Sequence, residues 1–268
     1  MRLVVLLAIL LAWAPPAQAG VEEVHYPAPF DGRPRRIWVR TPAVPADTAN
    51  LLVAFDALDF LGEIPLPAML DSLERAGRIP PTVAVLVDDS TGVARQQDLA
   101  NRQAFADWLC DGVMPWIRAH YKVARDPHRA ATCGTSAGGL AAAFIAFERP
   151  DVFGNAVSLS GAFWRNAEAK GSPPWEWLTG QVAASPGKDV RFVIDVGEKE
   201  TTGVLGGTGP SILAANRRLR KALEAKGYDL VYVEAKGGTH SPGSWNVRLP
   251  PALVALNRRP PRSAAARP

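Results

Sequence analysis

Thr132-Cys133-Gly134-Thr135-Ser136-Ala137-Gly138-Gly139-Leu140 is the stretch that decides the fold of this chain. It contains Gly-x-Ser-x-Gly, the pattern of a nucleophile elbow, in which a strand turns sharply into a helix with the serine at the apex. The turn requires strand and helix to approach closely, so side chains at Gly134 and Gly138 would clash. The stretch therefore predicts Ser136 as a nucleophile and the Ala137 N–H as a donor to a developing oxyanion.

The segments on either side of the elbow agree with this prediction. Residues 129–133 can form a short buried strand, although alanine has a low strand propensity. Residues 140–148 favour a helix, which Pro150 ends. A glycine-rich turn without any chemistry is the alternative, so the serine needs partners elsewhere in the chain.

Strand-like and helical segments alternate over the rest of the chain. Alternating or fully apolar patterns predict strands at residues 21–26, 36–40, 51–55, 82–87, 155–159, 190–196 and 230–234. Helices are predicted at 67–76, 97–120 (with a kink or break at Pro115), 140–148, 211–226 and 245–256, whereas 164–184 is irregular and rich in tryptophan. Without internal repeats or an interdomain linker, this alternation predicts one three-layer α/β domain, a mostly parallel sheet with helices on both faces.

The first 19 residues have the pattern of a signal peptide. Arg2 precedes an apolar run over residues 3–14, too short to span a bilayer comfortably, and Ala17-Gln18-Ala19 is an A-x-A cleavage site. We expect cleavage after Ala19 and a periplasmic or secreted protein without stable membrane insertion; an uncleaved anchor is the alternative. Residues 20–257 would form the folded domain, and residues 258–268 a disordered basic tail.

The formal net charge of +4 does not indicate a nucleic-acid partner. Four of the 30 basic residues lie in the tail and one is Arg2, which leaves 25 basic against 26 acidic residues in the body. A near-neutral body gives no charge-based reason to expect a nucleic-acid partner. No Cys-x-x-Cys or His-x-x-x-His spacing indicates a metal site, and we expect neither a metal nor a cofactor.

Cys110 and Cys133 are the two cysteines of the chain. Export permits a disulfide, and the helix that carries Cys110 could pack on the strand that carries Cys133. A bridge is therefore geometrically conceivable. Two separate buried thiols are the other possibility, which we favour because cysteine is among the most often buried residue types.

A nucleophilic serine needs a base, and the chain has four histidines. His25 lies in the first predicted strand, His120 ends a helix and His128 lies in the turn before the elbow strand. His240 follows the last predicted strand in Lys236-Gly237-Gly238-Thr239-His240, and loops in that position form sites in open α/β sheets. The Gly-Gly pair lets the loop bring His240 over the elbow; a solvated loop histidine is the alternative.

The acid that orients the base should lie between Ser136 and His240 in the chain. Asp195 would lie within a strand, whereas Glu198 and Glu200 lie in the loop after it. A glutamate from that loop is long enough to reach the imidazole Nδ1–H. Loop geometry favours Glu200 over Glu198, and either could instead be a solvated surface charge.

A second oxyanion donor should come from the loop after an early strand. Residues 55–59 fit that position, and the candidate donors are the backbone N–H groups of Ala57 and Leu58. We expect Asp56 to order this loop rather than to take part in chemistry.

With these residues identified, the chain resembles the enterochelin (enterobactin) esterase-like, esterase D-type branch of the α/β-hydrolases over about residues 35–256. The similar segments are 51–56 (a strand ending in Asp-Gly in the family), 95–99 (Arg-x-x-Glu-Leu), 114–117 with Tyr121 and Asp126-Pro127, 134–140 (Gly-x-Ser-x-Gly-Gly-Leu), Phe153-Gly154, 158–161, 197–200 (Gly-x-x-Glu) and 237–240 with Trp245 (Gly-Gly-His…Trp). The Gly-x-x-Glu match favours Glu200 as the acid. The chain departs from the family pattern where Ala57 replaces a glycine, Asp98 replaces a glutamate, and Thr239 separates Gly-Gly from the histidine.

The resemblance implies an α/β-hydrolase fold and a serine esterase that acts through an acyl-enzyme without a cofactor. The chain looks like the exported, single-domain kind, without the additional N-terminal domain of the cytoplasmic enzymes. The resemblance also implies a small-molecule ester substrate, and the family suggests a catecholate siderophore lactone. Arg95 and Lys199 are candidate contacts for the anionic ferric complex of such a siderophore. Aromatic candidates for its aryl rings are Trp164, Trp175 and Trp177, and Trp245 is a further candidate substrate-binding residue. The alternatives are that Arg95 pairs with Asp98 and that the tryptophans serve packing.

Other functions fit the same residues. An acyltransferase would pass the acyl group to an alcohol, as exported mycolyltransferases of similar fold do. A hydrolase of feruloyl-like esters or thioesters is a nearer alternative. A non-catalytic binding protein on a hydrolase scaffold is a third, but an inert relative has no reason to keep serine, glutamate and histidine in order.

Overall fold

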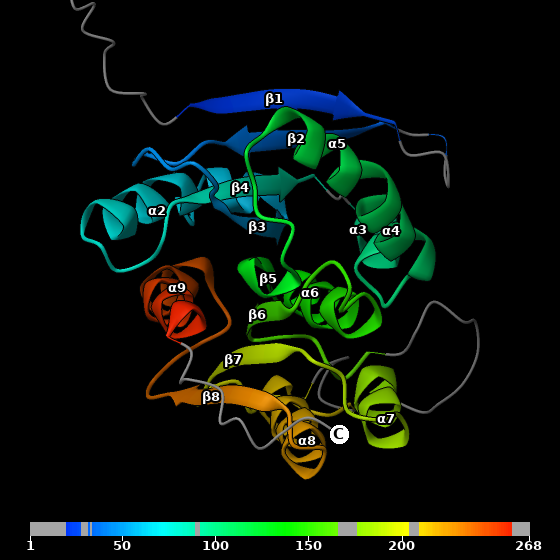
Figure 1. Ribbon diagram of the computed structural model, residues 1–268. Helices are drawn as coiled ribbons and strands as arrows, with labels where there is room; N and C mark the ends of the chain where they lie inside the picture. The colour runs from blue at the N-terminus through cyan, green and yellow to red at the C-terminus, as the bar shows by residue number, and fades with distance from the viewer. Residues whose placement is uncertain are drawn as a thin grey trace, which may run out of the picture.

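Eight strands form one sheet within residues 20–27, 32, 34–88, 92–165, 176–203 and 209–258, which are the residues that the computed structural model describes (Figure 1). The spatial order is β1-β2-β4-β3-β5-β6-β7-β8. The strands are β1 (Val21–Tyr26), β2 (Arg35–Arg40), β3 (Asn50–Phe55), β4 (Thr82–Val87), β5 (Ala130–Thr135), β6 (Asn155–Leu159), β7 (Arg191–Gly197) and β8 (Asp229–Ala235). β2 pairs antiparallel with β1 and β4, and the pairs from β4 through to β8 are parallel.

Helices cover both faces of this sheet (Figure 1). On one face lie α1 (Ala57–Leu61), α2 (Leu66–Arg75) and α9 (Pro242–Asn257). On the other lie α3 (Gly92–Asp98), α4 (Gln103–Asp107), α5 (Met114–His120), α6 (Ala137–Glu148), α7 (Trp177–Ala184) and α8 (Ile212–Ala225). This is the α/β-hydrolase architecture that the sequence predicts.

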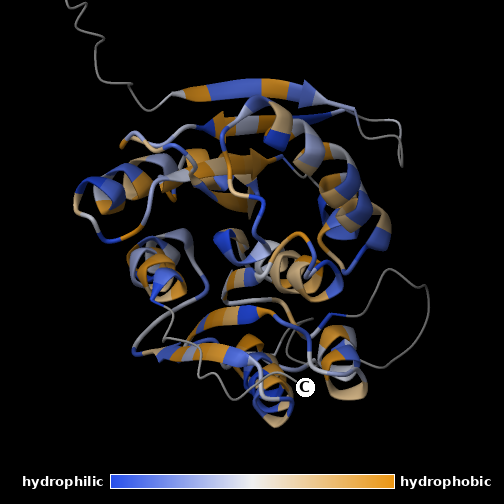
Figure 2. Ribbon diagram, viewed as in Figure 1, coloured by the Kyte–Doolittle hydropathy of each residue, from blue (hydrophilic) through white to orange (hydrophobic). Residues whose placement is uncertain are grey.

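The alternation of side chains along each strand supplies two hydrophobic cores. In β3, Val53 and Phe55 pack with α6, whereas Leu52 and Ala54 pack with α2 and α9 on the opposite face. Figure 2 shows the result: the central strands are largely hydrophobic, and the helices also carry hydrophilic residues. Because β5 lies between β3 and β6 at the centre of the sheet, its alanines form a fully buried strand despite their low propensity.

The predicted helix over 97–120 is interrupted in the structure. α3 ends at Asp98, and a second helical run starts with α4 and passes through a π-helical turn, Trp108–Val113, into α5. Pro115 has no N–H to donate to the preceding turn of the helix. This missing hydrogen bond is a physical reason for the wider, π-helical turn directly before it. The segment predicted as irregular also contains a helix, α7, in which Trp177 packs edge-on against Phe144.

The two cysteines lie on opposite faces of the sheet and are free. Cys110 lies in the π-helical turn and Cys133 in β5. The bridge is therefore ruled out, because the helix with Cys110 packs against the face away from the Cys133 side chain. Burial raises the pKa of both thiols to about 12.

Some sequence predictions lie outside the described residues: the signal peptide at 1–19, Trp175, and residues 259–268 of the tail. Within the described ranges, no helix combines the length and the apolar character that crossing a membrane requires.

Candidate active site

Ser136 lies between β5 and α6, at the carboxyl edge of the sheet, with φ 53° and ψ −117°. An added Cβ at Gly134 would overlap the backbone of Gly138 and come within 2.8 Å of the Gly139 nitrogen. An added Cβ at Gly138 would lie 3.1 Å from Asp56 Oδ2. The backbone around the serine therefore has the tight strand–turn–helix geometry that the sequence predicts.

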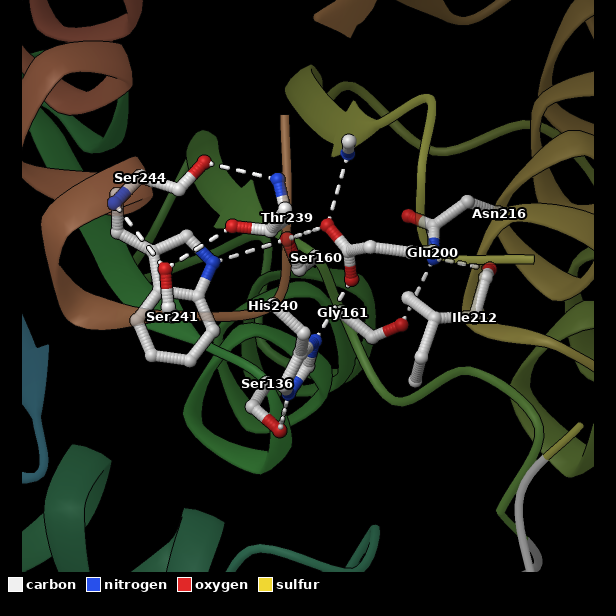
Figure 3. A network of polar contacts seen from close by, with 12 residues as sticks. Ser136, Ser160, Gly161, Glu200, Ile212, Asn216, Thr239, His240, Ser241 and Ser244 are labelled. Carbon is white, nitrogen blue, oxygen red and sulfur yellow. Dashed lines mark hydrogen bonds and ion pairs between the residues drawn. The ribbon is translucent and has the colours of Figure 1, made fainter. Parts of the chain in front are cut away.

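His240 reaches the serine from the loop after β8 (Figure 3). Its Nε2 lies 2.9 Å from Ser136 Oγ, and its Nδ1 lies 2.6 Å from Glu200 Oε2. A carboxylate can only accept, so Nδ1 carries the proton and Nε2 is left to accept the hydrogen bond from the serine hydroxyl. The structure thus brings together the three predicted residues Ser136, His240 and Glu200.

Glu200 is buried and its second carboxylate oxygen is also satisfied. Oε1 accepts hydrogen bonds from Ser160 Oγ at 2.6 Å and from the Gly197 N–H at 2.8 Å. Burial raises the pKa of this carboxyl, but the hydrogen bonds from His240, Ser160 and Gly197 outweigh it and lower the pKa overall. Glu200 therefore stays ionised and can hold the imidazole in one orientation.

Glu198, the other candidate acid, makes a different contact. Its Oε2 accepts a hydrogen bond from the Gly237 N–H at 3.2 Å, away from the imidazole nitrogens. Asp195 lies within β7, as predicted, and its Oδ1 pairs with Arg248 Nη1 at 2.6 Å.

Two glycines let the acid loop and the histidine loop touch. A Cβ on Gly197 would overlap the carbonyl of Gly238 and come within 2.7 Å of Glu200 Oε1. The Lys199 N–H donates to the Gly238 carbonyl at 3.0 Å, which fastens the two loops together. The Gly-Gly pair before His240 thus serves close backbone contact as well as turning of the chain.

The predicted oxyanion donors lie at two helix starts beside the elbow. Ala137 opens α6, and Ala57 and Leu58 open α1, so their N–H groups have no acceptor within their own helices. α1 follows β3, whose end contacts Gly138 of the elbow. Both helix starts therefore face the same edge of the sheet as Ser136.

Asp56 orders the loop before α1. It has a left-handed backbone with φ 63°, and its buried carboxylate pairs bidentately with Arg95, with Nη2 2.7 Å from Oδ2. The alternative prediction, that Arg95 pairs with Asp98, is wrong. Asp98 instead accepts from Arg35 and Arg102, each at 2.7 Å.

Trp245 is buried behind His240 rather than open to a substrate. Its indole N–H donates to Ser160 Oγ at 2.9 Å, and its ring lies edge-on to the imidazole at 4.9 Å. Trp245 was predicted as a substrate-binding residue, whereas its burial and its contacts with Ser160 and His240 indicate that it supports the histidine. Trp164 is half-buried and packs against the cluster of Val196, Ile212 and Leu213, which agrees with a packing role.

Ser160 and Arg248 are site residues that the sequence reasoning missed. Ser160 is fully buried after β6 with φ 52°, and Arg248 Nη2 donates to its Oγ at 2.9 Å. Trp245 and Arg248 are three residues apart on α9 and therefore share a face of the helix. The spacing of three residues from Trp245, which belongs to the Gly-Gly-His…Trp motif, is a signal from which Arg248 could have been predicted.

Comparison with known proteins identifies the family of the chain. A model of the family described as "Putative esterase" matches residues 30–256. The chain belongs to this esterase family. One curated relative is the iron(III) enterobactin esterase from Dickeya dadantii (strain 3937). It is 29% identical to this chain over an alignment that covers 79% of this chain and 49% of the relative. The enzyme of the same name from Escherichia coli (strain K12) is 27% identical over 83% of the chain and 53% of its own length.

Solved structures show the same fold. The enterobactin esterase from Shigella flexneri, crystallised in the presence of enterobactin, superposes with a TM-score of 0.78 at 23% identity, over 90% of this chain and 60% of that one. A ferulic acid esterase superposes with a TM-score of 0.70 at 14% identity, over 90% and 98% of the two chains. At such identities the likeness shows the fold alone. The chain spans about half the length of the curated relatives that it matches.

Proposed function

We propose that this family member is an exported serine esterase that works through a Ser136–His240–Glu200 triad and an acyl-enzyme. The observation that carries the proposal is the continuous hydrogen-bonded path from the serine hydroxyl through both imidazole nitrogens to a buried, ionised carboxylate. This is the arrangement that activates a serine hydroxyl at neutral pH.

The mechanism follows from the donors and acceptors at the site. Ser136 Oγ attacks the ester carbonyl while His240 Nε2 takes its proton, and Glu200 stabilises the resulting imidazolium. The N–H groups of Ala137 and of Ala57 or Leu58 hold the oxyanion; loss of one such donor typically raises the barrier by roughly 2.7–4 kcal/mol. His240 then protonates the leaving alcohol, and a water that it deprotonates releases the acid from Ser136.

For the substrate, we propose a catecholate siderophore lactone. The support is the activity for which the relatives are named, enterobactin ester hydrolysis, together with Arg95, whose side chain is about a quarter exposed beside the Asp56 loop. Export rests on the signal-peptide pattern of residues 1–19 alone.

The first prediction is that Ser136→Ala abolishes ester hydrolysis. Purified protein lacking residues 1–19 is assayed with a short-chain aryl ester and a catecholate trilactone, wild type beside the variant. We expect the wild type to hydrolyse both, because both present a carboxylic ester to the same serine, and the variant to hydrolyse neither. The ratio of kcat/KM for the two substrates measures the preference for the siderophore.

A fluorophosphonate probe and an added alcohol complete the test. The probe should label the wild type on Ser136 and leave the variant unlabelled. Equal rates for wild type and Ser136→Ala would end the triad proposal, as would a wild type that is inert and unlabelled. If the acyl group passes to the alcohol in preference to water, the chain is an acyltransferase.

A further inference from the structure

A buried arginine lies unusually close to the acid of the proposed triad. The Arg248 side chain is 6% exposed, and its Nη2 lies 3.5 Å from Glu200 Oε1. An unopposed cation at this distance would compete with His240 for the carboxylate and weaken the imidazolium. The same guanidinium, however, pairs with Asp195, whose side chain is 8% exposed, with Nη1 2.6 Å from Oδ1.

The remaining bonds of Arg248 reach the segments that carry the acid and the base. Nη2 donates to Ser160 Oγ at 2.9 Å and to the Thr239 carbonyl at 3.2 Å. Ser160 donates in turn to Glu200, and Thr239 directly precedes His240 (Figure 3). One side chain of α9 thus connects the ends of β6 and β7 with the histidine loop.

We propose that Arg248 and Asp195 are positioning residues of this esterase. Arg248 fixes Ser160, Glu200 and the loop of His240, while Asp195 cancels the charge of Arg248 so that the Glu200 carboxylate stays committed to the imidazole. The inference rests on the proposed triad and adds two residues that do not touch the substrate.

The charges around the site make the role of Asp195 testable. The charged and titratable groups on the segments packed here are Asp195, Glu198, Lys199, Glu200, Lys236, His240 and Arg248. Burial raises the pKa of Asp195, and the Arg248 charge opposes this rise. With Asp195 ionised, the arginine is neutralised, and Glu200 remains as the uncompensated charge beside the imidazole.

The decisive variant is Asp195→Asn, which leaves the charge of Arg248 unopposed. We expect the acidic limb of the kcat/KM profile to move to lower pH by about one unit, a tenfold change in proton affinity, because a nearby cation disfavours imidazolium. The value of kcat should fall with little change in KM. NMR of the His240 imidazole, assigned with His240→Gln, should show the same shift in its protonation midpoint without any turnover.

Two further variants separate charge from geometry. Asp195→Asn combined with Arg248→Met removes both charges, so the protonation midpoint of His240 should return to the wild-type value. The value of kcat should stay low because the guanidinium that positions Ser160 and Glu200 is missing. Arg248→Lys keeps the charge balance but not the planar fork, so the midpoint should hold and kcat should fall. The second variant tests the positioning role even if Asp195→Asn fails to fold.

Asp229→Asn is the matched control. Asp229 pairs with Arg191 at 2.8 and 2.9 Å at the opposite end of β7, roughly 13 Å along the strand from Asp195. It should leave the His240 midpoint unchanged. The inference is overturned if Asp195→Asn leaves the midpoint in place, if the double variant does not restore it, or if Arg248→Lys keeps the wild-type kcat. A wild type that hydrolyses no ester refutes the proposed function instead, and the NMR midpoints still decide the charge relation.

Discussion

Two glutamates that are two residues apart show how the surroundings of a side chain select its role. Glu200 is buried and its carboxylate meets donors on both oxygens, from the imidazole on one side and from Ser160 and Gly197 on the other. Glu198 accepts one longer hydrogen bond from an exposed backbone N–H. Only the first environment holds a carboxylate ionised and fixed in direction, which is what an orienting acid requires.

This difference predicts the behaviour of two matched amide variants. Glu200→Gln should lower kcat by roughly 10³–10⁴-fold, because an amide cannot stabilise the imidazolium and can hold the wrong imidazole tautomer. Glu198→Gln should change kcat by less than about threefold, since its carboxylate does not touch the imidazole. Initial rates on an aryl ester measure both, and comparable losses in the two variants would contradict the assignment of the acid.

The lowered pKa of Glu200 also predicts how stability depends on pH. A carboxyl whose pKa is lower in the folded than in the unfolded chain stabilises the fold above its unfolded pKa. This contribution is lost as the pH falls from about 4.3, the usual value for glutamate, through the folded pKa. The free energy of unfolding of the wild type should therefore exceed that of Glu200→Gln at pH 7, and the gap should narrow at pH 3. Urea titrations at the two pH values measure it, and a gap independent of pH would be inconsistent with the shift.

At the scale of elements, the site depends on two loops that meet backbone to backbone at Gly197 and Gly238. Gly197→Ala should lower kcat by at least tenfold, because the new methyl group would overlap the Gly238 carbonyl and crowd Glu200 Oε1. Gly180→Ala in α7 is the control, since a Cβ there meets nothing within 4 Å. It should leave kcat unchanged and raise the free energy of unfolding by roughly 0.5–1 kcal/mol. Wild-type kcat for Gly197→Ala would show that the loops can separate without loss.

The elements that the sequence predicted well are those whose pattern is local. The strands at 82–87 and 155–159 have the predicted bounds, because β4 and β6 are buried along their whole length and β4 consists almost wholly of apolar residues. α7 was missed because Gly180 and two β-branched residues weaken its helical pattern, and its packing on Phe144 is a tertiary contact. The π-helical turn depends on the passage from α4 into α5 and likewise leaves no local pattern.

The same distinction applies to the site. Ser136 and His240 could be predicted, since glycine motifs accompany both and the order of strands places both loops at one edge. Loop geometry and the Gly-x-x-Glu motif favoured Glu200 over Glu198 from the sequence, but the partners of each carboxylate are visible only in the folded loop. Arg248 could not be placed from its own neighbourhood, because its role depends on how α9 crosses the ends of β6 and β7.

At the scale of the whole molecule, the sheet separates the two thiols. Cys110 packs in the core beneath α5 and α6, and Cys133 in the core beneath α2 and α9. Because both are buried with pKa values raised to about 12, neither should react with a thiol-specific disulfide reagent in the native protein at pH 8. Two thiols should react after denaturation without a reductant. A count of zero under denaturing conditions would indicate a bridge and would contradict the packing.

The position of α9 has a consequence for the order of synthesis. The nucleophile and the base are 104 residues apart, and the arginine that ties their supporting segments together follows eight residues later still, in the last helix described. A ribosome-bound chain that has already folded the elbow therefore still lacks both the proton acceptor and the clamp behind it. Hydrolytic competence would begin only after residue 248 has been synthesised and α9 has packed, so chains that stop before this point would not attack esters.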